Sequence, residues 1–217
     1  MMLQDAAAHA ACADGADWLS RLASEGWAIR EGVLPPALVA ALREEAERQY
    51  EAGQMERAGI GRADDHTLDR EVRRDRVMWL EGETLAQVQF LEAMELLRLE
   101  LNRELFLGLF ELEAHFAVYE AGAFYVRHVD AFRGERNRIV SVVLYLNPDW
   151  REGDGGELAI YAPDAEEAAA PIALAQPRAG AMAVFLSEEI PHEVLTAKAR
   201  RYSIAGWFRV REELPAA

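Results

Sequence analysis

The chain has 217 residues, of which 51% are hydrophobic and 28% charged, a composition typical of a globular enzyme with one substantial core. Its net charge of -15 at pH 7 repels a phosphate backbone, which argues against nucleic acid as a partner. Cys12 is the only cysteine, which excludes an intramolecular disulfide and a thiolate metal cluster and fits a reducing cytoplasm.

The chain is expected to form a single catalytic domain over residues 1–217. Residues 1–16 are rich in alanine, lack the basic start of a signal peptide and are expected to be disordered. The longest strongly apolar run, Ile139–Leu146, is far shorter than the roughly 20 residues that a membrane-spanning helix needs. We therefore expect no membrane partner.

Residues 17–107 are predicted to form a mainly helical support region. A short apolar strand is expected at Trp27–Leu34, and helices are expected at about Pro36–Ala52 and about Thr84–Phe106, where apolar residues recur every three or four positions. Between these helices, Glu51–Arg70 is rich in glycine and charge and has neither period. It is predicted to be a mobile surface loop, and loops of this length often act as lids.

Residues 108–210 are predicted to form a series of short strands. Turn motifs such as Asn147-Pro148-Asp149 and Gly153-Asp154-Gly155-Gly156 separate them. The predicted strands are Glu111–Tyr119, Phe124–His128, Arg138–Leu146, Glu157–Tyr161, Ile172–Leu174, Ala181–Leu186 and Arg201–Val210. This series predicts a mainly β fold, a double-stranded β-helix (jelly roll) braced by the N-terminal helices.

His128 and Asp130 lie two positions apart in a strand-like stretch, and His192 follows later in the chain. Alternate side chains of a strand project to one face, so His128 and Asp130 can bind one cation, with His192 as the third ligand. Two imidazoles and one carboxylate suit a non-haem Fe(II) that keeps other positions open for an organic acid and dioxygen. We therefore predict an iron site formed by these three residues.

Two further residues are candidates for binding the far carboxylate of that acid. Arg201 offers two parallel N–H donors, which match a carboxylate, and a buried anion requires such a charge partner. Strand alternation places Tyr145 on the same face as Ser141 and Val143, so its hydroxyl can add a donor. By the same alternation, Arg201 shares a face with Trp207.

Several motifs surround these residues along the chain. They are Tyr125-Val126-Arg127-His128-Val129-Asp130, Tyr145-Leu146-Asn147 with Asp149-Trp150, Gly155-Gly156-Glu157-Leu158, Pro191-His192-Glu193-Val194 and Arg201-Tyr202 through Trp207, with Val72–Arg76 and Trp79–Gly82 upstream. From about Trp18 to Phe208 the chain thus resembles the Fe(II)/2-oxoglutarate dioxygenases. Within them it is most similar to the prolyl 4-hydroxylases that act on hypoxia-inducible factors and to their bacterial relatives.

The resemblance implies specific roles for individual residues. It implies that 2-oxoglutarate chelates Fe(II) and pairs with Arg201, and that Tyr119 and Tyr125 lie near the cosubstrate or the iron. The remaining residues that it implicates are Trp207, beside the metal, and Arg127 and Arg138, as substrate contacts. Dioxygen is the second cosubstrate, and ascorbate is a further candidate cofactor.

The reaction implied by the resemblance is hydroxylation of a prolyl residue to 4-hydroxyproline, coupled to conversion of 2-oxoglutarate and O2 to succinate and CO2. The partner would be a protein with an exposed proline loop. For a bacterial relative, a translation elongation factor is the natural candidate.

The chain departs from the family pattern at three places. Arg74 replaces a glycine in an Arg-Gly-Asp step, Tyr119–Tyr125 is one residue shorter, and Ala131–Asn137 is altered in length. The first two changes affect expected substrate contacts and the third affects the rim beside Asp130. None of them alters the three proposed metal ligands.

Three other functions remain open at this point. The same iron site could hydroxylate a free amino acid or small metabolite, which would require a fixed charge for that substrate's own carboxylate. Nucleic-acid demethylation is disfavoured by the acidic charge and by Trp207, which stands where demethylases of this type carry another arginine. A metal-free sensor or scaffold is disfavoured by the intact set of three ligands.

Overall fold

The computed structural model describes residues 17–58, 72–131 and 137–211. The helices and strands, in chain order, are α1 (Asp17–Glu25), β1 (Trp27–Arg30), α2 (Pro36–Glu51), β2 (Glu56–Arg57), β3 (Asp75–Trp79), α3 (Leu85–Leu105), β4 (Glu111–Tyr119), β5 (Tyr125–His128), β6 (Arg138–Tyr145), β7 (Leu158–Ile160), β8 (Ala173–Ala175), β9 (Met182–Leu186), β10 (His192–Val194) and β11 (Arg201–Arg209).

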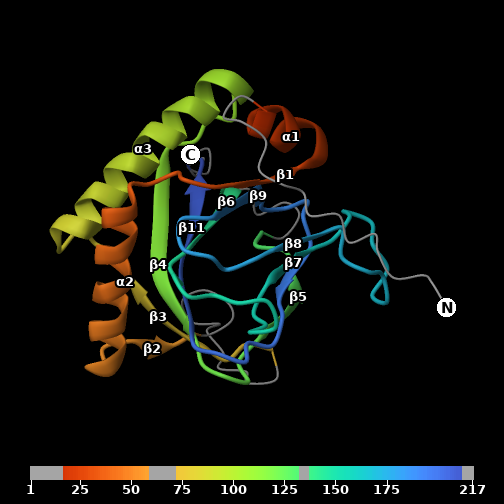
Figure 1. Cartoon of the computed structure of the whole chain (residues 1–217). Helices are drawn as coiled ribbons and strands as arrows, with labels where there is room; N and C mark the ends of the chain where they lie inside the picture. Colours follow the sequence, from red (N-terminus) through yellow and green to blue (C-terminus); the bar gives the residue numbers. More distant parts are fainter. Residues whose placement is uncertain (1–16, 59–71, 132–136, 212–217) are drawn as a thin grey trace, which may run out of the picture.

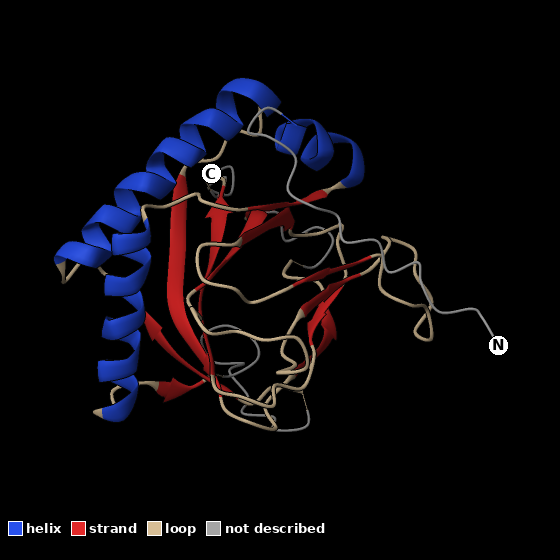
Figure 2. Cartoon of the chain, viewed as in Figure 1, coloured by secondary structure: helices blue, strands red, loops and turns tan. Residues whose placement is uncertain are grey.

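The strands form two antiparallel sheets. The larger has seven strands in the order β1-β9-β6-β11-β4-β3-β2, and the smaller has four in the order β5-β10-β7-β8. Figure 1 shows α2 and α3 along one side of the larger sheet and the smaller sheet on the other side. Figure 2 shows the same separation of helices from the smaller sheet. This arrangement confirms the predicted jelly roll braced by N-terminal helices.

The helices begin where local chemistry allows it, and a buried polar bridge joins them. Pro36 opens α2, a position where its missing N–H costs nothing, and Thr84 caps α3 by accepting a hydrogen bond from the Gln87 N–H. Glu45 of α2 accepts hydrogen bonds from Gln87 Nε2 at 2.6 Å and from Thr84 Oγ1 at 2.7 Å. These bonds fix α2 against α3 behind the larger sheet.

Alternation along β6 and β11 divides their side chains between two faces. Val142, Ile204 and Phe208 are at most 1% exposed and belong to the apolar core that includes residues of all three helices. On the other face, Tyr145 opposes Ser203 and Ser141 opposes Trp207. Tyr145 and Ser141 of β6 therefore lie beside Ser203 and Trp207 of β11 on this face, as strand alternation predicted.

Three strands, β2, β3 and β10, were not predicted. β3 lies inside the region predicted to be helical and pairs with β4 over its whole length. β10 is three residues long and pairs with both β5 and β7. A strand of three residues is too short to show a period of two, and β3 is recognisable only through its partner.

The predicted mobile loop Glu51–Arg70 is only partly a loop. α2 ends at Glu51, β2 pairs with β3, and Met55 is 2% exposed, so the first residues are packed against the sheet. Residues 59–71 lie outside the described residues, as do residues 1–16, for which disorder was expected. Within the described ranges, no helix is long and apolar enough to span a membrane.

Candidate metal centre

The structure brings His128, Asp130 and His192 together from two strands of the smaller sheet and the bend that follows one of them. His128 and His192 are paired across β5 and β10, with ring centroids 4.3 Å apart. Nε2 of His128 lies 3.5 Å from Asp130 Oδ1, and Nε2 of His192 lies 3.7 Å from Asp130 Oδ2. One nitrogen or oxygen from each residue falls within 4.8 Å of the others, a spacing that can hold a metal ion.

Asp130 reaches this cluster by a different route from the one predicted. β5 ends at His128, and Asp130 lies in a bend after the strand, where its backbone N–H donates to Ser187 O at 3.0 Å. Strand alternation therefore does not place Asp130; the contact with Ser187 after β9 does. Its Oδ2 accepts a hydrogen bond of 2.6 Å from Ser141 Oγ, which fixes the carboxylate.

Both imidazoles are oriented by backbone carbonyls. Nδ1 of His128 lies 2.8 Å from Val126 O, and Nδ1 of His192 lies 2.9 Å from Ile190 O. A carbonyl oxygen can only accept, so each Nδ1 carries a hydrogen, and the neutral form of each imidazole has its lone pair on Nε2. The two Nε2 atoms are the ones that approach Asp130.

The electrostatics favour the protonation states that a cation needs. Burial opposes ionisation of Asp130, but His192, His128 and the Ser141 hydroxyl more than offset it, so its pKa lies well below the usual range. Burial and the neighbouring His128 lower the pKa of His192 to about 4. A carboxylate beside a neutral imidazole is a ligand set ready for a divalent metal.

Arg201 lies in the larger sheet with unused donors. Its side chain belongs to a residue 1% exposed, and Nη1 donates to Ser203 Oγ at 3.0 Å. Within the described residues, Nε and Nη2 of Arg201 and the Tyr145 hydroxyl are buried without a hydrogen bond of acceptable geometry. Each unmet buried donor costs about 1–3 kcal/mol, so this set fits a bound carboxylate better than an empty interior.

The two predicted tyrosines lie beside different parts of the site. Tyr125 stacks on His128 with ring centroids 3.6 Å apart and planes 19° apart. Tyr119 is paired with Arg201 across β4 and β11, and its ring centroid lies 4.9 Å from Arg201 Cζ. Burial raises the pKa of both tyrosines, so each keeps its phenolic hydrogen.

Trp207 and Arg138 form a stacked pair near the metal ligands. Trp207 is opposite Ser141, the residue that donates to Asp130, and Arg138 Cζ lies 3.9 Å from the centre of the Trp207 ring. Arg138 already donates to Glu113, with Nε 2.7 Å from Oε1. Arg138, which was predicted to contact a substrate, therefore already uses donors in this ion pair.

Arg127 is directed toward the loop between β7 and β8. Its Cζ lies 3.3 Å from the Tyr161 ring centroid, and Nη1 donates to Glu166 O at 2.9 Å. Arg127 therefore attaches the loop between β7 and β8 to β5. Its proposed contact with a substrate stays a prediction.

Several residues that shape the site were not predicted from the sequence. Ser141 and Ser203 share faces with Tyr145 and Arg201, so strand alternation could have assigned them as hydrogen-bond partners. Glu113 could not be found in this way, because its partner Arg138 is 25 positions away on a strand that is not adjacent to its own.

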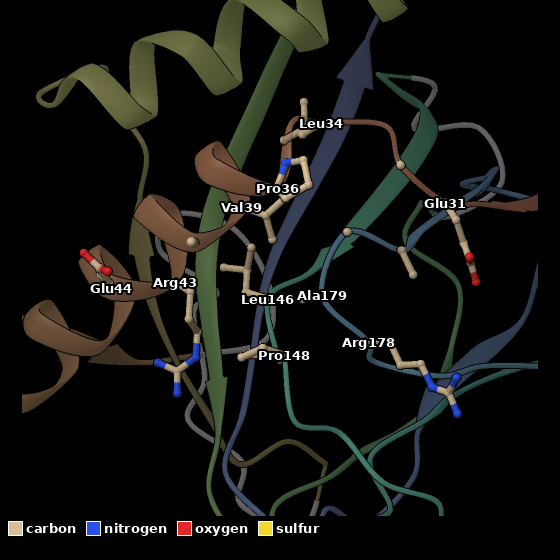
Figure 3. Close-up of a pocket in the computed structure, with 14 residues that line it drawn as sticks. Glu31, Leu34, Pro36, Val39, Arg43, Glu44, Leu146, Pro148, Arg178 and Ala179 are labelled. Atoms are coloured by element: carbon tan, nitrogen blue, oxygen red, sulfur yellow. The ribbon is translucent and has the colours of Figure 1, made fainter.

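A cavity of about 570 Å³ lies elsewhere in the molecule, between the start of α2 and the chain after β6. Figure 3 shows the apolar side chains of Leu34, Val39 and Leu146 gathered there, with Glu44 directed away from them. None of the three candidate metal ligands lines this cavity. We assign it no part in the chemistry.

Comparison with known proteins identifies relatives of this chain. Residues 114–209 match the model of the 2OG-Fe(II) oxygenase superfamily. A prolyl-4-hydroxylase structure from Pseudomonas putida is 42% identical with a TM-score of 0.80, over 89% of this chain and 98% of that chain. A Trichoplax adhaerens prolyl hydroxylase, in complex with a hypoxia-inducible factor peptide fragment, has a TM-score of 0.77 at 24% identity, over 88% of this chain and 87% of that one.

The chain also resembles longer curated proteins. Human Egl nine homolog 1 is 33% identical over 151 residues, which are 64% of this chain and 33% of the human protein. The chain thus spans about a third of the length of that relative. The matches confirm the family resemblance that the motifs predicted.

Proposed function

The chain belongs to the 2OG-Fe(II) oxygenase superfamily, and on that premise we propose that it hydroxylates a prolyl residue of a protein to 4-hydroxyproline, with conversion of 2-oxoglutarate and O2 to succinate and CO2. The observation that carries the proposal is the combination of a cation-ready set of ligands with a buried guanidinium whose donors are unmet.

His128, Asp130 and His192 would hold the iron. When bound, Fe(II) with 2-oxoglutarate supplies the activation of O2 and the oxidation of a C–H bond. Each imidazole Nδ1–H donates to a backbone carbonyl, Val126 O or Ile190 O, so that Nε2 faces the metal position, and Ser141 Oγ donates to the Asp130 carboxylate. These outer contacts fix the ligands before any metal arrives.

Arg201 and Tyr145 would bind the far carboxylate of 2-oxoglutarate. The guanidinium presents Nε and Nη2 as a two-pronged donor, and the Tyr145 hydroxyl adds a third. Burial and the adjacent Arg201 act in opposite directions on Tyr145, and burial prevails, raising its pKa to about 12. Tyr145 therefore stays a hydrogen-bond donor at neutral pH.

Two relatives support a prolyl residue as the target. The Pseudomonas putida structure is that of a prolyl-4-hydroxylase, and the Trichoplax enzyme is bound to a peptide fragment of a hypoxia-inducible factor. Trp207, which is 9% exposed and has Arg138 over its ring, would line the pocket next to the ligands. A proline loop of a translation elongation factor is our candidate substrate, in the cytoplasm, where the single cysteine would stay reduced.

A small metabolite is the weaker candidate substrate. Such an enzyme needs a fixed charge in the site for the substrate's own carboxylate. Beside the candidate ligands, Arg138 is paired with Glu113 and Arg73 with Asp75. Both arginines are therefore already neutralised, which favours a substrate bound through its peptide backbone and apolar groups.

The test is incubation of the purified protein with Fe(II), 2-oxoglutarate and a library of proline-containing peptides, with elongation factor included. Mass spectrometry should find peptides heavier by one oxygen atom, together with an equal amount of succinate. His192→Ala should give neither product. A parallel incubation contains free amino acids in place of the peptides. Oxygen added to a free amino acid but to no peptide would favour a small-metabolite substrate, and no succinate under any condition would exclude both functions.

A further inference from the structure

Residues 72–75 form a short strap that joins the two sheets. Val126 N donates to Val72 O at 3.0 Å and Arg74 N donates to Phe124 O at 3.1 Å, so the strap runs along β5 of the smaller sheet. From Asp75 onward the chain becomes β3, whose first residue pairs with Tyr119 in the larger sheet. The strap therefore contacts the strand that carries His128 and the strand that lies beside Arg201.

A buried ion pair lies within the strap. Arg73 Nε and Nη2 lie 2.8 Å and 2.6 Å from the two carboxylate oxygens of Asp75. The Asp75 side chain is 0% exposed and that of Arg73 is 13% exposed. Burial opposes the charge on Arg73, but Asp75 outweighs it and raises the arginine's pKa. A buried pair of this kind is weak evidence for stability, because apolar residues of similar size often serve equally well.

The ion pair is connected to the candidate metal centre through one aromatic ring. Arg73 Cζ lies 4.5 Å from the centre of the Tyr125 ring, within the range of a cation–π contact. Tyr125 also stacks on His128, with ring centroids 3.6 Å apart. The Asp75 carboxylate, the Arg73 guanidinium, the Tyr125 ring and the His128 ring thus form a continuous series of contacts.

This series controls a freedom of His128 that its hydrogen bond leaves open. The bond from Nδ1–H to Val126 O fixes one atom of the imidazole and leaves the tilt of the ring plane to the other contacts of the ring. The Tyr125 ring lies on the imidazole face and limits that tilt. We infer that Arg73 and Asp75 are positioning residues that hold Tyr125 on His128, and so keep Nε2 of His128 directed at Asp130.

The inference rests on the proposed metal centre, and its test uses cobalt(II) binding to the purified full chain, with no turnover required. Tyr125→Leu removes the ring and should weaken cobalt(II) binding about 10–100-fold, the range found when a partner of a metal ligand is lost. Tyr125→Phe keeps the ring and should bind cobalt(II) like the unchanged protein. The visible absorption of bound cobalt should change in the first variant alone, because it reports the ligand geometry.

A paired replacement tests the ion pair itself. Arg73→Met combined with Asp75→Leu leaves no unpaired buried charge, so the chain should still fold, while cobalt(II) binding should fall as in Tyr125→Leu. Glu95→Gln, which removes an exposed ion pair on α3, is the matched control and should leave cobalt(II) binding unchanged. If the paired replacement folds and binds cobalt(II) like the unchanged protein, Arg73 and Asp75 do not position Tyr125. If it does not fold, Asp75→Asn, which keeps the size of the side chain and weakens its hold on Arg73, is measured in its place.

The outcomes separate this inference from the proposed function. If the unchanged protein binds cobalt(II) and all variants bind it equally, the positioning role is wrong and the metal centre stands. If Tyr125→Phe loses as much affinity as Tyr125→Leu, the hydroxyl acts instead of the stacked ring, and the inference is again wrong. If the unchanged protein takes up no cobalt(II), the proposed function and the inference both fall.

Discussion

The two faces of the seven-stranded sheet differ in chemistry although the same strands form both. On β11, Tyr202, Ile204 and Phe208 are all 0% exposed and pack in the core shared with the helices. The alternate residues of the same strand include Arg201, which has unmet donors, and Trp207, which lies beside Arg138. One face therefore consists of apolar contacts, and the other carries polar groups that are costly to bury.

The helix-packed face contributes mainly to stability, and the opposite face carries the residues of the candidate site. Apolar burial on the helix-packed face stabilises the fold. On the other face, unmet buried donors oppose folding, and such departures from good packing are expected at functional sites. Substitutions on the helix-packed face should therefore lower stability, and substitutions on the other face should lower metal or cosubstrate binding.

The largest effect is expected at Asp130, which approaches both histidines. Loss of a partner of a metal ligand already costs about 10–100-fold in affinity, so loss of the ligand itself in Asp130→Ala should cost more and abolish turnover. Cobalt(II) titration and succinate release measure the two effects. Asp164→Asn, in an exposed loop, is the control and should change neither. Metal binding by Asp130→Ala at full affinity would contradict the assignment.

Phe208→Ala tests the opposite face. Removal of a fully buried phenylalanine should lower the free energy of unfolding by about 3–5 kcal/mol, through lost burial and a residual cavity. Urea denaturation measures this loss. Molecules that remain folded should bind cobalt(II) normally. A specific loss of metal binding at unchanged stability would show that the two faces are not separate.

Arg201→Met should weaken cosubstrate binding without weakening the fold. Loss of one partner of a buried charge pair costs about 2–5 kcal/mol, and calorimetric titration of the cobalt-loaded protein with 2-oxoglutarate should show a loss of that size. The free energy of unfolding should stay the same or rise, because the unmet donors Nε and Nη2 are removed. A destabilised protein with unchanged 2-oxoglutarate binding would identify Arg201 as a structural residue.

The smallest effect concerns His115, a buried residue packed between Trp79 and Trp207. Burial lowers its pKa from 6.5 to about 4, so the folded protein keeps it neutral while the unfolded chain takes up a proton. Unfolding should therefore become easier as the pH falls from about 6.5 to about 4. His115→Phe should reduce this slope, measured from urea midpoints across that range; an unchanged slope would show that His115 contributes nothing to it.

Much of the strand structure could be predicted because residue types alternate along the longer strands, where successive side chains point to opposite faces. β4 was predicted with its observed limits, and β6 and β11 were predicted to within one residue. The limits of β7 and β8 were one residue off at both ends, since strands of three residues show little period. β10, another three-residue strand, was missed for the same reason.

The candidate site was predictable only in part. Residue types and spacing indicated His128, Asp130, His192 and Arg201, and the structure places the first three around one point. The partners that orient them were harder to find. Glu113 and Asp75 depend on which strands become neighbours, and the position of Asp130 depends on a backbone contact with Ser187.

The sequence by itself determined the alternation of apolar and polar residues, and hence which side chains of a strand share a face, because successive strand residues point in opposite directions. The tertiary structure alone decided which strands pair, which arginines are neutralised, and which ring lies on His128. The two kinds of feature differ in how far apart along the sequence the residues that produce them lie. A period is a property of neighbouring residues, whereas an ion pair or a stacked ring requires distant segments to meet in one register.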